Sequence, residues 1–169
     1  RFHARHDATS RAYLYRIAMS KRAFEKRYVW WVKAELDVRA MAMAAQKLPG
    51  KHDFRCFCDS DAASEEKSTA VVVETAHIEV DGELILFRIV ASHFVWRMVR
   101  RVTGVLVKLG LHEITMDDFD KLLAGRADPR LDVAAWTAPS SGLFLESVRY
   151  PENAGSAIAR QPWRQSIRR

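Results

Sequence analysis

The segment HFVWRMVRRVTGVLVKLG, residues 93–110, constrains the fold more than any other part of the chain. Its apolar residues recur at helical spacing, which predicts a helix over residues 94–109 with one face in a hydrophobic core. The same segment carries four cations and no acid, namely Arg97, Arg100, Arg101 and Lys108. At about 100° per residue these side chains share one side of the helix. The sequence therefore predicts a buried stripe opposite a basic stripe.

A glycine, Gly104, falls in the middle of the expected basic stripe. Glycine inside a helix lowers helix stability by about 1 kcal/mol relative to alanine, so a structural or functional role is expected for it. One interpretation is clearance for a backbone or a ligand that approaches the helix closely. The other is close packing against a neighbouring strand. The sequence favours neither.

Positive charge is concentrated at the two ends of the chain. The net charge is +6 over 169 residues, and residues 1–33 hold nine Lys or Arg against two acids. The last ten residues, RQPWRQSIRR, add four arginines and no acid. Concentrated cations favour a polyanionic partner, with nucleic acid first, because arginine forks match phosphate geometry. The alternative is a basic protein without a nucleic-acid partner.

The pattern along the chain predicts an α+β fold with a mixed, largely antiparallel sheet and helices packed on it. Strands are expected over residues 11–19, 28–36, 53–58, 69–80, 83–92 and 142–150, with a hairpin turn at Asp81-Gly82. Besides the opening helix, helices are expected from Asp37 to about Leu48 and over 115–125. Residues 59–68 are expected to form an exposed loop. We expect one domain over 1–151 and a basic, flexible tail over 152–169.

Cysteine usage and hydropathy exclude several classes. Two cysteines, Cys56 and Cys58, are too few for a disulfide framework, so a reducing cytoplasm is expected. No apolar run approaches the roughly 18 residues of a membrane span. Together with His52, the cysteines offer three zinc ligands, but no fourth follows at a structural-zinc spacing. We therefore expect no metal.

Four blocks occur in one order across residues 1–151: RFHARHDATSRAYLYRI, HDFRCF, HFVWRMVRRVTGVLVKLG and TAPSSGLFLESVRYP. Together they closely resemble the C-terminal half of TruA-type tRNA pseudouridine synthases. The resemblance implies isomerisation of uridine to pseudouridine in the tRNA anticodon arm, at positions about 38–40, where the base must leave the stack to be reached. It also implies no cofactor, a homodimer that binds tRNA across both subunits, and one lobe of the pseudouridine synthase fold beside a basic cleft.

The resemblance assigns roles to particular residues. Tyr13 matches the active-site tyrosine, whose ring would stack on the flipped uracil and whose hydroxyl would assist proton removal from C5. Arg100 matches the arginine that pairs with the catalytic aspartate. Leu143 matches an apolar residue near the target base. Tyr15, two residues from Tyr13, shares its face of a strand and is a further substrate-binding candidate. Remaining candidates for RNA contact are Arg97, Arg101 and Lys108. For Tyr13 and Leu143 the alternative is sheet core.

The chain departs from the family pattern at the nucleophile. The family's aspartate lies in a Gly-Arg-Thr-Asp-x-Gly-Val-His motif of the N-terminal half, and this motif is absent here. Asp7 and Asp53 lack its flanking residues. We therefore expect that the N-terminal half is missing from this chain, that the chain alone is inactive, and that its uncovered apolar surface favours association.

Two other function classes remain open. The main alternative is a non-catalytic, basic RNA-binding module with the same fold, which an upstream region without the Gly-Arg-Thr-Asp motif would indicate. The third is a basic protein–protein interaction domain. It would not show the strong salt dependence of tRNA affinity that phosphate contacts require.

Overall fold

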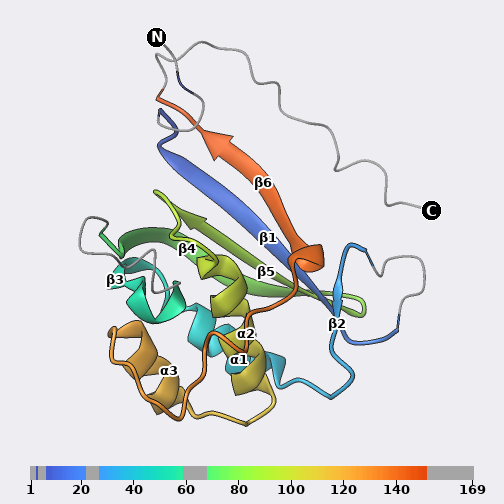
Figure 1. Ribbon diagram of the computed structural model, residues 1–169. Coiled ribbons are helices and arrows are strands. Elements are labelled where there is room, and N and C mark those ends of the chain that lie inside the picture. Colours follow the sequence, from blue (N-terminus) through green and yellow to red (C-terminus); the bar gives the residue numbers. More distant parts are fainter. Residues whose placement is uncertain (1–2, 4–6, 22–26, 59–67, 152–169) are drawn as a thin grey trace, which may run out of the picture.

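In the part of the chain that the structure describes, the fold is built on one sheet of six strands (Figure 1). The computed structural model describes residues 3, 7–21, 27–58 and 68–151. The strands are β1 (Ser10–Ala18), β2 (Trp30–Trp31), β3 (Gly50–Asp53), β4 (Ala70–Asp81), β5 (Leu84–Ala91) and β6 (Leu143–Arg149). Their order is β2-β1-β5-β4-β3, and β6 also pairs with β1. Among the described strands, only the β1–β2 pairing is parallel. The expected mixed, largely antiparallel sheet is confirmed.

The helices lie on one side of this sheet, while parts of β1 and β6 extend beyond them (Figure 1). They are α1 (Val38–Ala45), α2 (Met98–Gly110) and α3 (Met116–Leu123), with 3₁₀ helices η1 (Phe54–Phe57) and η3 (Ser140–Gly142). This arrangement confirms the α+β class. Within the described ranges, no helix has both the length and the apolarity needed to cross a membrane.

Local signals set several element ends as expected. The carboxylate of Asp37 accepts from the backbone N of Ala40, at 2.9 Å, and caps α1. Thr115 and Asp118 form a reciprocal capping box at the start of α3. The β4–β5 hairpin is present, with Gly82 at φ 58°, but Asp81 pairs with Leu84, so the two-residue loop is Gly82-Glu83. The turn is shifted by one residue from the expected one.

Two expected strands differ from the structure. Only Trp30–Trp31 of the 28–36 segment is a strand. Residues 54–57 form η1 because the Asp53 carboxylate accepts from Arg55 N and from the Thr69 hydroxyl, which turns the chain and buries Phe54 and Phe57. The expected loop over 59–68, except for Ser68, and the expected tail over 152–169 lie outside the described residues.

The helix expected over 94–109 begins only at Met98, and its basic stripe does not form. Arg97 precedes the helix in a left-handed conformation, Arg101 is 5 % exposed, and Gly104 is buried. The turn segment before η3 runs along this side of α2. A Cβ at position 104 would lie 1.8 Å from the carbonyl oxygen of Trp136, so the glycine admits a backbone there. The absence of a side chain at Gly104 therefore lets α2 pack closely against a turn, and not against a strand.

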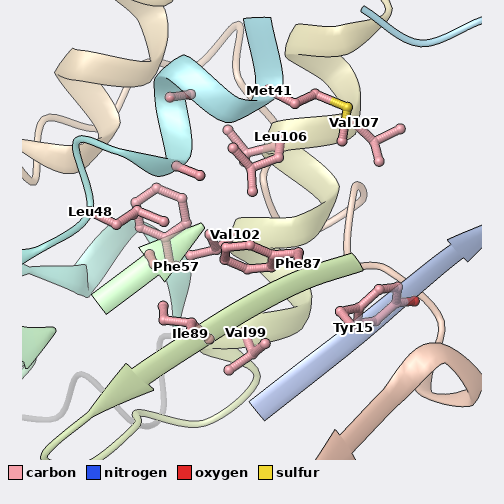
Figure 2. Close-up of a cluster of buried hydrophobic side chains, with 14 of the residues drawn as sticks. Tyr15, Met41, Leu48, Phe57, Phe87, Ile89, Val99, Val102, Leu106 and Val107 are labelled. Carbon is pink, nitrogen blue, oxygen red and sulfur yellow. The ribbon is translucent and has the colours of Figure 1, made fainter. Parts of the chain in front are cut away.

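The hydrophobic core lies between the sheet and the helices. Figure 2 shows Val99 and Val102 of α2 close to Phe87 and Ile89 of β5, Leu106 near Met41 of α1, and Tyr15 of β1 at the margin of the cluster. α2 is thus central to the fold. Its first turn, and the strand that carries Tyr15, are held in place by this core.

Candidate active site

The central strand β1 presents two tyrosines on the helix-covered face, two residues apart. Tyr13 is half-buried, and its ring meets the ring of Phe94 edge-on, with centroids 4.9 Å apart. Tyr15 is fully buried, and its hydroxyl donates to the carbonyl oxygen of Pro139 at 2.6 Å. The two tyrosines therefore differ in access: a substrate can reach Tyr13 more readily than Tyr15.

Tyr15 is enclosed by the segment that leads into β6. A Cβ at Gly142 would lie 2.7 Å from Cε1 of Tyr15, so the glycine lets the chain pass directly against the ring. Burial raises the pKa of the Tyr15 hydroxyl well above its ordinary value, and the positive charge of Arg100 opposes this shift. Tyr15 therefore keeps its proton and acts as a hydrogen-bond donor at any physiological pH.

Arg100 lies in the first turn of α2 and is bound to the same segment. Its Nε donates to the carbonyl oxygen of Ala138 at 2.6 Å, and its own carbonyl accepts from the backbone N of Ala138 at 3.1 Å. Within the described part of the chain, the Nη groups of Arg100 make no hydrogen bond. One edge of the guanidinium is thus fixed by the protein, while the Nη groups remain able to bind a carboxylate.

The third candidate, Leu143, begins β6 opposite Tyr15. The register pairs Leu143 with Tyr15 and Leu145 with Tyr13, so both leucines share the face of the tyrosines. Leu143 is half-buried, whereas Leu145 is 55 % exposed. The structure therefore brings Tyr15, Leu143 and Arg100 together around the residues 138–142, with Tyr13 one step along the strand.

The remaining cations do not form one surface with Arg100. Arg97 is exposed and directly precedes α2. Lys108 lies near the C-terminal end of α2, about 16 Å from Arg97 along the helix axis at the rise of an α-helix. Lys108 pairs with Glu113 and lies over the ring of Trp136. Arg101 is buried. Of the three, Arg97 is the exposed one.

The two aspartates considered as stand-ins for the nucleophile are engaged elsewhere. Asp53 binds Arg55 and Thr69, and the hydrogen bond from Arg55 holds its pKa below the ordinary value. Asp7 accepts from the backbone N of His3. Across the described ranges, no three His, Cys, Asp or Glu side chains gather as a metal site, so His52, Cys56 and Cys58 do not form one there.

Sequence reasoning missed the groups that hold the site together. Phe94 supports Tyr13, and the carbonyl groups of Ala138 and Pro139 bind Arg100 and Tyr15. Backbone carbonyls have no residue signature, so no pattern search finds them. The one available signal was Gly142, which directly follows two serines and permits the close approach to Tyr15.

Comparison with known proteins places the chain in a family. The family model described as tRNA pseudouridine synthase matches residues 44–151. A relative from Moorella thermoacetica named tRNA pseudouridine synthase A is 38% identical over 151 residues, which is 88% of this chain and 59% of the relative. Proteins of the same name from Thermotoga maritima and Halalkalibacterium halodurans are 34% and 35% identical, over 88% and 85% of this chain.

The chain therefore belongs to the tRNA pseudouridine synthase family. Since these relatives carry the name tRNA pseudouridine synthase A, the resemblance to the TruA type drawn from the four sequence blocks is confirmed. The chain spans 59%, 60% and 53% of the length of the three relatives.

Proposed function

We propose that this chain is part of a tRNA pseudouridine synthase that converts uridine to pseudouridine in the anticodon arm of tRNA. In this reaction the bond from N1 of uracil to the ribose breaks, a bond from C5 forms, and the C5 proton leaves. Tyr13 stacks on the displaced uracil and assists removal of that proton, while Leu143 packs near the base. Arg100 holds the catalytic aspartate, which another part of the protein supplies. The chain alone is then inactive.

The state of Arg100 is the observation that carries this proposal. Its Nε is bound to Ala138, so the plane of the guanidinium is fixed. Its Nη groups have no hydrogen-bond partner among the described residues, and no described carboxylate is bound to it. A bidentate pair with an incoming aspartate would keep that carboxylate ionised and oriented. This geometry supports a role for Arg100 as the receiving half of a site completed from elsewhere.

The proposal is tested by tritium release from tRNA labelled at C5 of uridine. The chain alone should release no tritium. A fusion that adds the N-terminal half of the Moorella relative, where we expect the Gly-Arg-Thr-Asp motif, should release it. In that fusion Arg100→Ala should abolish release, and Tyr13→Phe should slow it about 100-fold or more, because a positioned acid–base group contributes 10²–10⁴-fold.

Arg39→Ala serves as the matched control, since Arg39 is an exposed arginine on α1. It should leave tritium release unchanged. Release by the chain alone would contradict the missing nucleophile. If the fusion releases nothing yet binds tRNA tightly and with strong salt dependence, the RNA-binding module becomes the better account.

The same proposal extends to partner and place. tRNA is the expected partner, the assembly is expected to be a homodimer, and the site is expected to work without a cofactor. The cytoplasm is the expected compartment. The net charge of +6 supports a polyanionic substrate.

A further inference from the structure

The turn between β5 and α2 exposes an aromatic side chain beside the candidate active site. Trp96 is 67 % exposed, the largest value among the exposed large hydrophobic residues in the described ranges. Its neighbours Phe94 and Val95 pack against the core, and Met98 is buried. Both ends of the turn are therefore anchored, and only its centre projects from the protein.

The backbone of this turn is unusual for the residues that it carries. A hydrogen bond from Met98 N to the Val95 carbonyl, 3.1 Å, closes the turn, with Trp96 and Arg97 at its centre. Arg97 has φ 63° and ψ 3°, the conformation of the third residue of a type II turn, where glycine or asparagine is normal. Left-handed conformations of other residues are unfavourable and persist where the surroundings impose them, often at functional sites.

The turn also lies next to the proposed catalytic tyrosine. Phe94, two residues before Trp96, contacts the ring of Tyr13. Arg11 Nη1 donates to the Ser92 carbonyl at 3.2 Å, which fixes the approach to the turn beside β1. Phe94 therefore links the start of the turn to Tyr13.

The surroundings of Trp96 favour a nucleotide over a protein partner. His93, three residues before Trp96, and Arg97, directly after it, are exposed and polar, whereas the cores of protein interfaces are depleted of charged residues. An aromatic ring next to a cation matches a base next to its phosphate.

We propose that the Val95–Met98 turn is a nucleotide-binding element, in which Trp96 stacks on an unpaired base next to the target uridine and Arg97 binds the adjoining phosphate. The inference rests on the proposed function, because it takes tRNA as the substrate. It adds a stacking residue and a phosphate contact that determine how the loop is held once the uridine has left its stack.

The test measures binding of the full chain to a fluorescein-labelled anticodon-arm hairpin by anisotropy. Trp96→Ala should weaken binding about 5- to 100-fold, the range for loss of one stacked base, and Trp96→Phe should retain most of the affinity. Trp31→Ala, at an exposed tryptophan on β2, is the matched control and should bind as the unchanged chain does. A hairpin with abasic loop positions should lower the affinity of the unchanged chain but not that of Trp96→Ala.

Arg97→Gly separates function from fold. Glycine is favourable at φ 63°, so this variant should unfold at higher urea concentration while the salt slope of RNA binding falls by about one.

Equal binding by Trp96→Ala and the unchanged chain would overturn the inference and leave the proposed function standing. An unchanged chain that binds no hairpin would overturn both. A change in sedimentation of Trp96→Ala, with RNA binding intact, would assign the turn to a protein interface and overturn the inference.

Discussion

At the scale of single residues, Tyr13 and Tyr15 differ because of what lies opposite them. Both belong to one face of β1 and carry the same side chain. The Ala138–Gly142 segment covers Tyr15, and its Pro139 carbonyl accepts the hydrogen bond from the Tyr15 hydroxyl, whereas Tyr13 is covered only in part, with Phe94 at its edge. This contrast favours Tyr13 over Tyr15 for the proposed substrate role, while Tyr15 binds the segment that also binds Arg100.

The burial of Tyr15 predicts a loss of stability at alkaline pH. Its pKa is raised above 10.0 in the folded chain, and we take the unfolded chain to ionise near that value. Above this pH the unfolded state gives up the proton that the folded state retains, so the free energy of unfolding falls as pH rises. Tyr15→Phe should flatten this fall between pH 9 and pH 11, roughly the range around the ordinary pKa of tyrosine.

Urea unfolding across that pH range measures the effect. At neutral pH, Tyr15→Phe should also lower the free energy of unfolding by about 1 kcal/mol through loss of the hydrogen bond to Pro139. Tyr28→Phe is the control, because Tyr28 is exposed, and it should change neither quantity. An unchanged alkaline slope in Tyr15→Phe would show that other groups cause the loss.

At the scale of elements, α2 packs against the 132–138 segment at Gly104, which lies directly against the carbonyl of Trp136. Gly104→Ala would ordinarily stabilise a helix by about 1 kcal/mol. Here the new methyl group meets the Trp136 carbonyl at 1.8 Å, and backbone cannot yield as a side chain can. We expect a net destabilisation of about 1–3 kcal/mol or more in urea unfolding.

Gly110→Ala provides the comparison within the same helix. Its methyl group would meet Cγ and Sδ of Met41 at 2.8 Å, and a flexible methionine can shift. The loss at Gly110 should therefore be smaller than the loss at Gly104. Equal losses would mean that helix packing in general, and not the carbonyl of Trp136, makes glycine necessary.

Elements with a local signal were predictable from the sequence. The caps at Asp37 and Thr115 and the hairpin at Gly82 depend on residues within a few positions of the element. The start of α2 was not predictable, because Arg97 adopts its left-handed conformation between two anchored ends of a turn. The pairing of β1 with β6 joins residues more than a hundred positions apart and has no local signature.

The candidate site likewise has features that the sequence predicts and features that it does not. Tyr13, Arg100 and Leu143 came from blocks that resemble a family, and the comparisons confirm that family. The roles of the three residues stay predictions. The burial of Tyr15 was not readable, because it is produced by the segment before β6 folding back against β1. Periodicity describes one element at a time and cannot show which segment covers it.

At the scale of the whole molecule, β6 lies at an edge of the sheet that the described residues form. Among the described strands β6 pairs with β1 alone, and Leu145 on this strand is more than half exposed. An open strand edge with an apolar side chain favours association with another chain. We therefore expect the chain to form dimers or larger species, in line with the proposed homodimer, and we expect β6 to take part.

Sedimentation velocity over a concentration series tests this expectation. The unchanged chain should sediment as a dimer or larger, and Leu145→Lys should shift it toward monomer, because a charge on an open edge opposes pairing. Val80→Lys introduces the same charge at an exposed apolar residue near the β4–β5 turn, and it should leave association unchanged. Urea midpoints show that each variant remains folded. A chain that is monomeric at every concentration would contradict the dimer, and equal association of both variants would remove β6 from the interface.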